Sequence, residues 1–365
     1  VLQGLQRYDL VNTVTTGATF ATVIGMGLVL LAGGGVVAMV AVTLPITLAS
    51  QLVSMAMIDR VAPHVRLRWQ GAQLSLIRPI LSFSGPLFVM QIAELMQRKT
   101  DEIVIAASLL IDAVTPYSLA RRLADLTRRL TDQFVRVLLP LASELQADEE
   151  HLKLQLLYTT GTRLTLALLL PMTCTLFVLG GTILGIWVGP LYAEYEPVLW
   201  VLALAALAST SQGPAASILK GMARHRPLAI SSLCSGIANL GLSLALIGQF
   251  GLMGVAVGTL IPTLAESLGF VLPYTMWVLH VSAKTVAKDV VLPTFVPAGL
   301  MAATLYVTLL FVHPTNAATL LFVISVGGLV YVLSYFNLGA SAVERQLLQT
   351  AGVDALRLAG GYLKR

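Results

Sequence analysis

The residues best suited to chemistry lie between positions 78 and 140, where charged side chains recur at helical spacing in an otherwise apolar chain. One series recurs at steps of three and four, which places it on one face of a helix: Ser118, Arg122, Asp125, Arg129, Asp132 and Arg136. The preceding segment carries a second series: Gln91, Glu94, Arg98 and Asp101. The opposite face of the later helix is apolar: Leu119, Leu123, Leu126, Leu130, Phe134 and Val137. We call these two segments the charge-striped helices.

The stripes allow two interpretations, which are compatible with each other. Pairs of opposite sign recur four residues apart, so the stripes are explained as self-neutralising structural pairs: Glu94–Arg98, Asp125–Arg129 and Asp132–Arg136. Ionisable groups within a membrane bundle also mark wet, charged cavities. Arg121 and Arg128 lie outside the paired stripe, so the segment carries surplus positive charge that favours an anionic ligand.

Composition places these helices in a membrane protein. Of the 365 residues, 56% are hydrophobic and 11% are charged, and the mean hydropathy is +0.83, whereas soluble domains average about 25% charged residues. The apolar runs are about 20 residues long and do not alternate, so they predict helices rather than a barrel. The fold class expected is an all-α polytopic membrane protein with about ten transmembrane helices.

The net charge of +5 does not indicate nucleic acid as a partner. Membrane proteins keep Lys and Arg in cytoplasmic loops, which alone produces a basic isoelectric point. No basic patch is interleaved with aromatic residues as a nucleic-acid site requires. Cys174 and Cys234 lie within apolar spans without metal-ligand spacing, and we expect no disulfide and no cofactor.

Hydropathy and loop charge together predict the topology. Besides the striped helices, separated by a turn at 110–116 and ended by Pro140, the expected spans are 10–32, 36–58, 154–180, 197–219, 228–248, 252–279, 291–312 and 316–338. The segments expected inside carry basic residues: 59–78, 144–153, 220–226, 281–289 and the tail. The turns expected outside carry no Lys or Arg: 181–196, 248–252 and 313–316. This distribution of charge requires that both striped helices cross the membrane or that neither does, because a single crossing would move every later basic loop outside. The first striped helix begins with an apolar stretch, which favours the alternative in which both cross.

The charge in the second striped helix restricts its surroundings. Each central charge costs roughly 2.5–3.5 kcal/mol on insertion scales. Residues 121–136 carry seven charges, so this face must meet protein or water rather than lipid.

The sequence lacks the common catalytic motifs. It contains no P-loop, HExxH or GxSxG sequence. The GxxxG spacings at 181–185 and 254–258 indicate close helix packing. Because no large loop is expected outside the membrane to hold catalytic groups, a transporter is favoured over an enzyme.

Several stretches, taken in order, resemble the oligosaccharide/polysaccharide flippase family, the Wzx-like members of the multidrug/oligosaccharidyl-lipid/polysaccharide exporter superfamily. These are LQGLQRYD, SFSGPLFVMQIAELMQRKTDEIVIA, TPYSLARRLADLTRRL, LLPLASELQADEE, GIWVGPLYAEYEPV and LKGMARHRP. The resemblance implies a MATE-like bundle of two six-helix lobes around a central cavity, often with two extra helices. It assigns 1–58 to the last two helices of the first lobe and 59–78 to a cytoplasmic linker. Residues 79–279 would be the second lobe, 280–338 the extra pair and 339–365 a cytoplasmic tail, with four helices missing before Val1.

The resemblance further implies transport of an oligosaccharide on undecaprenyl diphosphate across the bacterial inner membrane by alternating access. The unit would belong to O-antigen, capsule or exopolysaccharide, and the expected partners are a glycan polymerase and other assembly proteins. The residues expected to bind the diphosphate or sugar are Arg98, Arg121, Arg122, Arg128, Arg129, Gln91, Gln97, Tyr117 and Ser118. Those expected to balance charge or bind a coupling ion are Glu94, Asp101, Asp125 and Asp132.

Three other functions remain open. A multidrug antiporter of the same superfamily would export cations and prefer a net acidic cavity. A lipid II flippase would carry the same diphosphate. A membrane glycosyltransferase or polymerase would require a large outside loop.

Overall fold

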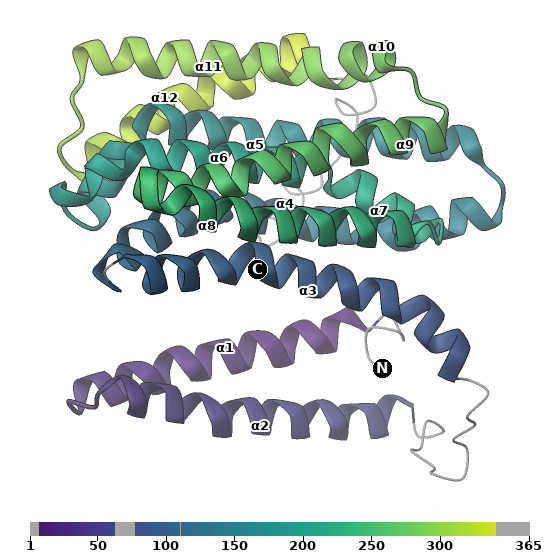
Figure 1. The fold of residues 1–365 in the computed structure, drawn as a ribbon, viewed down its shortest axis with the longest axis horizontal. Coiled ribbons are helices and arrows are strands. Elements are labelled where there is room, and N and C mark those ends of the chain that lie inside the picture. The colour runs from purple at the N-terminus through teal and green to yellow at the C-terminus, as the bar shows by residue number, and fades with distance from the viewer. Residues whose placement is uncertain (1–6, 63–76, 110, 341–365) are drawn as a thin grey trace, which may run out of the picture. The chain divides into compact units, whose positions relative to one another are not determined.

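The computed structural model describes residues 7–62, 77–109 and 111–340. Every regular element in these ranges is a helix, and the chain divides into two units, residues 1–78 and 79–365 (Figure 1). The predicted fold class, an all-α polytopic membrane protein, is confirmed. The expected cytoplasmic tail at 339–365 lies almost entirely outside the described residues, as does most of the linker at 59–78.

The first unit is a helical hairpin of α1 (Tyr8–Leu31) and α2 (Val36–Val61). The chain reverses at Gly33, whose φ of +76° is readily available to glycine and rare for other residues. The two helices pack closely at Gly25, where an added Cβ would lie 2.7 Å from Val42 Cγ1. Pro45 is accommodated inside α2. The predicted spans 10–32 and 36–58 are therefore confirmed as helices.

The charge-striped helices are α3 (Ile77–Ser108) and α4 (Val114–Ala147), joined through a short 3₁₀ turn, η3 (Ile111–Ala113). The prediction that Pro140 ends the second helix is wrong, because α4 continues for two turns beyond it. The expected loop at 144–153 shrinks to residues 148–150 before α5 (His151–Trp187) begins. The polar residues Ser143 and Glu144 stay helical with exposed side chains, so their polarity marks solvent rather than a helix end.

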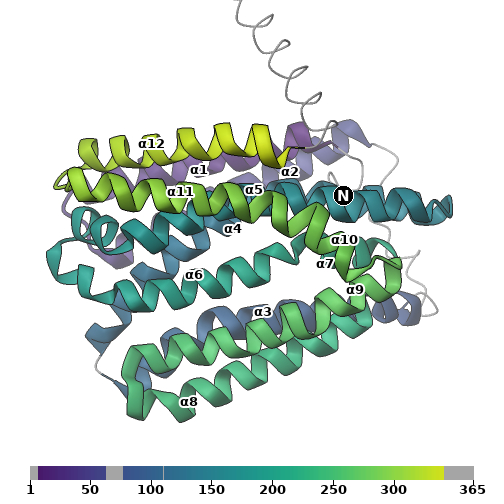
Figure 2. The same ribbon diagram turned by 90° about the horizontal axis from the view of Figure 1, so that it is seen from above.

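The remaining helices of the second unit follow in order: η4 (Pro190–Tyr195), α6 (Glu196–Ser211), α7 (Gly213–Gly221), α8 (His225–Leu264), η5 (Ala265–Val271), α9 (Leu272–Leu279), α10 (Ala283–Val286), η6 (Ala287–Val291), α11 (Leu292–Phe311), α12 (Ala317–Ser334) and η7 (Tyr335–Gly339). Side chains of α5 form much of the core, and Leu154, Leu169 and Leu179 are fully buried. The α11–α12 pair packs against α5 (Figure 2). Tyr331 Oη of α12 donates to the carbonyl of Ala167 of α5 at 2.7 Å.

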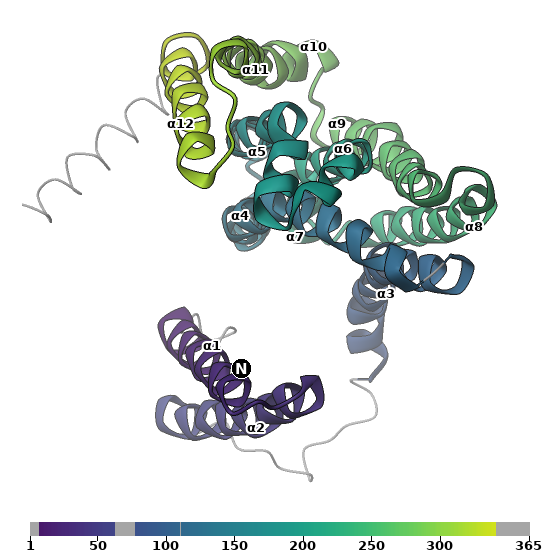
Figure 3. The same cartoon turned by 90° about the vertical axis from the view of Figure 1, so that its left-hand side faces the viewer.

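Helix α8 is a hairpin rather than one rod, because Gly251 has φ 56° and ψ −134°. We call His225–Phe250 its first arm, and the chain from Leu252 through η5 and α9 to Leu279 its second arm. The arms lie side by side and antiparallel (Figure 3). Asn239 Nδ2 donates to Thr259 Oγ1 at 2.9 Å, and Ser243 Oγ donates to the carbonyl of Val255 at 3.5 Å. The predicted segments 228–248 and 252–279, with a turn between them, are confirmed as helical.

Among the described residues, seven segments are long and apolar enough to cross a membrane: Asp9–Leu31, Val36–Val61, His151–Trp187, Pro190–Gly221, His225–Leu279, Ala283–Phe311 and Ala317–Gly339. His225–Leu279 has 55 residues and reverses at Gly251, which provides two crossings. Helices α3 and α4 do not reach this apolar threshold, yet their 32 and 34 residues exceed the length that spans about 30 Å of hydrocarbon. Their crossing remains a prediction.

The close approach of the α8 arms at Gly258 gives the first testable prediction. A Cβ at Gly258 would lie 2.6 Å from Ser243 Oγ and 2.7 Å from Ser243 N, so Gly258→Ala must push the arms apart. We expect a loss of about 1–3 kcal/mol of stability, measured as a lower thermal unfolding midpoint in detergent. Gly269→Ala is the matched control on the same arm, since nothing lies within 4 Å of its Cβ position. Equal midpoints for the two variants would contradict this packing.

Candidate functional site

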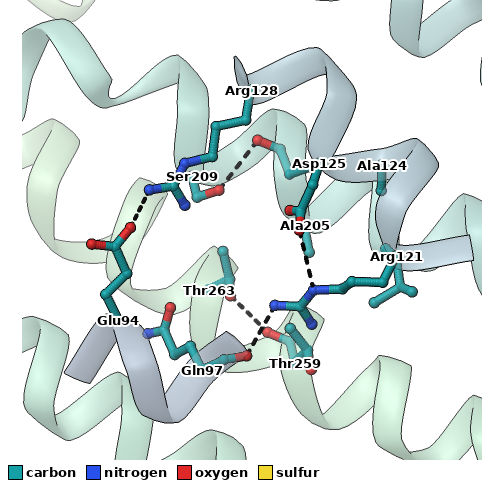
Figure 4. A pocket seen from close by; sticks show the side chains of 12 residues that line it. Glu94, Gln97, Arg121, Ala124, Asp125, Arg128, Ala205, Ser209, Thr259 and Thr263 are labelled. Carbon is teal, nitrogen blue, oxygen red and sulfur yellow. Dashed lines mark hydrogen bonds and ion pairs between the residues drawn. The ribbon is translucent and has the colours of Figure 1, made fainter. Parts of the chain in front are cut away.

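A small polar pocket lies inside the second unit, between α3, α4, α6 and the second arm of α8 (Figure 4). It is lined by Glu94, Gln97, Arg121, Ala124, Asp125, Arg128, Leu202, Ala205, Ala206, Ser209, Thr259 and Thr263. The cavity volume is about 50 Å³, whereas a water molecule needs about 10–15 Å³ on this measure. The pocket therefore has room for a few waters or a small ion, but not for a sugar diphosphate in this conformation.

Arg121 connects α4 to α3 across this pocket. Its Nη1 lies 2.8 Å from Asp101 Oδ2, and its Nη2 donates to the carbonyl of Gln97 at 2.9 Å. Asp125, one turn further along α4, lies 3.9 Å from Arg121 Nε. The guanidinium is 14% exposed and Asp101 is 1% exposed, so this ion pair is largely withdrawn from solvent.

Arg128 repeats this arrangement two turns along α4. It forms an ion pair with Glu94 of α3, and its Nε lies 3.7 Å from Asp132. Each inward arginine therefore has one carboxylate partner on α3 and one on α4. The pocket lining carries two arginines and two carboxylates, so it is neutral rather than net basic. This agrees with the interpretation of the stripes as structural ion pairs.

Asp101 is the centre of a buried cluster. Its Oδ2 accepts from Tyr117 Oη at 2.7 Å and from Thr259 Oγ1 at 2.8 Å, in addition to Arg121. The other oxygen of Asp101, Oδ1, is buried without a hydrogen-bond partner. Asn239, whose Nδ2 donates to Thr259 Oγ1, also has a buried Oδ1 without a partner. Unpaired buried oxygens are rare because each costs about 1–3 kcal/mol.

No group of three or more His, Cys, Asp or Glu side chains capable of holding a metal occurs in the part of the chain that the structure describes. The nearest approach to a cation site is the Asp101–Asn239–Thr259 cluster, where oxygen atoms of the kind that hard cations prefer converge. The prediction of a coupling ion therefore remains a prediction, and Asp101 is the acidic residue that best suits it.

The structure brings together seven of the residues that the sequence singled out: Glu94, Gln97, Asp101, Tyr117, Arg121, Asp125 and Arg128. By contrast, Gln91, Arg122 and Arg129 are exposed and lie outside the pocket lining. Ser118 and Asp132 are partly exposed, with Ser118 Oγ donating to the carbonyl of Thr115. The side chain of Arg98 lies outside the described residues.

The orientation of α4 explains this division. Between Ala120 and Thr131, the buried residues of α4 are all small: Ala120, Ala124, Thr127 and Thr131. The predicted leucine face is partly exposed, with Leu126 and Leu130 at 48% and 58%. In a membrane, lipid accommodates leucine as well as a protein core does, so small residues take the helix contacts. This rotation points Arg121 and Arg128 towards α3 and turns Arg122 and Arg129 outward.

Sequence reasoning missed the α6 and α8 side of the site. Thr259 and Asn239 complete the Asp101 cluster, and Ser209 lines the pocket. They are neutral residues more than 60 positions from the striped helices, so spacing alone does not connect them. Glu266 was also missed, although it is the only Asp, Glu, Lys, Arg or His between Arg226 and His280.

Comparisons with known proteins identify the family. Residues 5–197, more than half of the chain, match the family described as "Polysaccharide biosynthesis protein". The chain belongs to this family. No curated protein sequence matches the chain.

A solved structure shares the fold of this polysaccharide biosynthesis protein. It is similar to "Lipid II flippase MurJ, inward closed conformation", with a TM-score of 0.64 and 16% sequence identity. The similarity covers 87% of this chain and 64% of that one, so the chain spans less than two thirds of the length of the flippase. The comparison shows a MurJ-like arrangement of helices in a multi-pass membrane protein.

The Arg121–Asp101 pair gives the second testable prediction. Arg121→Ala leaves Asp101 buried without its cation, which costs about 3–5 kcal/mol when a buried pair is broken on one side. We expect a clearly lower thermal unfolding midpoint in detergent. Lys99→Ala is the control, because Lys99 forms an exposed pair with Glu102 whose loss changes stability by less than about 1 kcal/mol. Similar midpoints for both variants would show that the buried pair does not hold α3 to α4.

Proposed function

We propose that this chain is part of a flippase that moves a lipid-linked oligosaccharide across the bacterial inner membrane by alternating access. One observation carries the proposal: a polysaccharide biosynthesis protein has the fold of a lipid II flippase over 87% of its length. Polysaccharide repeat units must cross the membrane attached to a lipid, and their head groups cannot pass through hydrocarbon. A helical transporter fits this task, and we propose no enzymatic activity.

The head group would meet the outward stripe of α4 rather than the closed pocket. Arg122 and Arg129 are exposed, and neither has a carboxylate partner among the described residues. A guanidinium without a counter-ion within the protein is available for charge-assisted hydrogen bonds to a diphosphate. Gln91 and Ser118 are further exposed or partly exposed polar residues on α3 and α4 that suit sugar hydroxyls.

The inward residues would have a different task. Arg121 and Arg128 are engaged by four carboxylates, so we propose that Glu94, Asp101, Asp125 and Asp132 balance charge. Gln97 and Tyr117 belong to the same network of contacts and would help position α3. These contacts would hold the striped helices together while the transporter changes conformation.

The carrier lipid and the glycan follow from the family rather than from any contact. We propose undecaprenyl diphosphate as the carrier, with an O-antigen, capsule or exopolysaccharide unit, and a glycan polymerase and other assembly proteins as partners. The similarity to a lipid II flippase favours lipid II as the second candidate, since its head group carries the same diphosphate. The neutral lining of the small pocket provides no support for the cation antiporter.

The third testable prediction concerns the outward arginines. In the full-length protein, Arg122→Ala combined with Arg129→Ala should reduce surface polysaccharide at least tenfold. A tenfold loss corresponds to about 1.4 kcal/mol. This is less than the free energy that one hydrogen bond to a charged group contributes. The lipid-linked repeat unit should accumulate on the cytoplasmic leaflet. Protein level in the membrane should not change, because neither side chain forms an ion pair with described residues.

Lys153→Ala combined with Lys99→Ala is the matched control, since it removes two exposed charges at helix positions away from the stripe. Normal surface polysaccharide in the double arginine variant would contradict the proposed role of α4. Impaired peptidoglycan synthesis with intact surface polysaccharide would assign the transporter to lipid II instead.

A further inference from the structure

Helix α5 contains a proline far from both of its ends. Pro171 lies 20 residues after His151 and 16 before Trp187, the first and last residues of α5. Proline has no backbone N–H, so the carbonyl of Ala167, four residues earlier, cannot receive its usual helical hydrogen bond from residue 171. In a membrane, neighbouring helices, hydroxyl side chains or ordered waters satisfy the carbonyls that proline frees in this way. We call the Ala167 carbonyl and Pro171 together the proline gap.

The donor that meets the proline gap comes from α12. Tyr331 Oη donates to the carbonyl of Ala167 at 2.7 Å, and both residues are buried. Stacking on Tyr335 holds the Tyr331 ring in place, with 6.0 Å between the ring centroids and 16° between the ring planes. A buried tyrosine hydroxyl usually finds such a partner. A hydrogen bond between two helices therefore replaces the one that Pro171 removes within α5.

The α11–α12 pair also contacts α5 on the other side of the proline. Cys174 Sγ, three residues after Pro171, lies 3.5 Å from the carbonyl of Ala298 in α11. In all three views, α11 and α12 lie beside α5 (Figures 1 to 3). The pair is therefore attached to α5 both before and after the proline gap. A change in the angle between the two halves of α5 must break or strain one of these contacts.

The two helices of this pair are held closely together. A Cβ at Gly327 of α12 would lie 2.5 Å from Leu305 Cδ2 of α11. A Cβ at Gly339, which follows α12 in η7, would overlap the carbonyl oxygen of Pro293 near the start of α11. A proline also frees that carbonyl, because Pro297 follows it by four residues. The pair is thus one compact unit that can act on α5 as a brace.

The second half of α5 is attached to α6, which forms one wall of the pocket. The backbone N–H of Gly181 donates to Glu196 Oε1 at the start of α6 at 2.8 Å. The two helices approach closely here, since a Cβ at Gly180 would lie 2.9 Å from Leu199 Cδ2. Further along α6, Ser209 lines the pocket. A movement of the second half of α5 therefore moves the α6 wall of the pocket.

We propose that Tyr331 is a positioning residue that closes the proline gap and thereby fixes the angle between the two halves of α5. The α11–α12 pair, which the sequence placed outside the second lobe, then has the function of a brace for that lobe. With the Tyr331 hydrogen bond in place, α5 behaves as one rigid helix. Without it, Pro171 lets the two halves flex, and the α6 wall follows the second half. The inference concerns the conformation of the protein and does not depend on the substrate.

The first experiment is a double-mutant cycle between Tyr331 and Pro171 in the full-length protein. Tyr331→Phe should lower the thermal unfolding midpoint in detergent by roughly 2 °C, because a buried carbonyl loses its donor. Pro171→Ala restores a backbone N–H to the gap, so in that background Tyr331→Phe should cause a much smaller shift. Tyr306→Phe, the same change at an exposed tyrosine of α11, should leave the midpoint unchanged. Equal shifts for Tyr331→Phe in both backgrounds would overturn the proposal.

The second experiment measures the angle within α5, which a merely stabilising hydrogen bond would not alter. Spin labels at Leu156 and Trp187 occupy exposed positions on the two halves of the helix. Both native cysteines are replaced by serine, which keeps a donor towards Ala298. Tyr331→Phe should then broaden the distribution of distances between the labels, and adding Pro171→Ala should narrow it again. An unchanged distribution in Tyr331→Phe, or one that stays broad after Pro171→Ala, would contradict the brace.

The test does not depend on Tyr331→Phe folding by itself. If that variant does not fold, the double variant with Pro171→Ala should still fold, because its backbone supplies the missing donor. Failure of the double variant to fold would show that the hydroxyl serves something other than the proline gap, and would overturn the proposal.

Neither readout requires a lipid-linked oligosaccharide, so this proposal and the proposed function can fail separately. A broadened distribution in Tyr331→Phe, together with normal surface polysaccharide in the Arg122 and Arg129 variant, would support the brace and contradict the proposed substrate contact. An unchanged distribution, together with a loss of surface polysaccharide in the arginine variant, would overturn the brace and support the substrate contact.

Discussion

The arrangement of the second unit depends on the buried ion pair between Arg121 of α4 and Asp101 of α3. Taking two charges out of water is expensive, and the cost is recovered only when other polar groups complete their hydrogen bonding. Tyr117, Thr259 and the Gln97 carbonyl do so here. Because these partners come from α3, α4 and the second arm of α8, the pair holds three elements in one relative position.

This constraint explains how α4 carries so much charge within a bundle of apolar helices. Lipid provides no hydrophobic preference between leucine faces, so α4 packs through Ala120, Ala124, Thr127 and Thr131 and leaves leucines partly exposed. Arg121 and Arg128 then lie on the flank that faces α3, where carboxylates meet them. The arginines of the predicted stripe, Arg122 and Arg129, are turned outward and are exposed.

Two carboxyl groups lie where α3 meets the α8 hairpin, and they differ in their partners. Asp101 of α3 has a counter-charge in Arg121 of α4 and accepts from Thr259 of the second arm. Glu266 of the second arm accepts hydrogen bonds from two neutral side chains, Ser232 of the first arm and Gln97 of α3. An ion pair therefore fixes one end of this contact, and hydrogen bonds between neutral donors and a carboxyl group fix the other.

The sequence by itself determined the all-α membrane class, the hairpins around Gly33 and Gly251, and the segment in which charge gathers, because hydropathy, glycine turns and helical spacing are local properties. It did not determine the end of α4, since Pro140 is tolerated within a helix, or which arginines face inward. Only the tertiary structure decided that orientation, because the rotation of a helix in a membrane follows from packing of small residues and not from the leucine face. It also brought Asn239, Thr259 and Glu266 to α3, since residues so distant in sequence meet only through the fold.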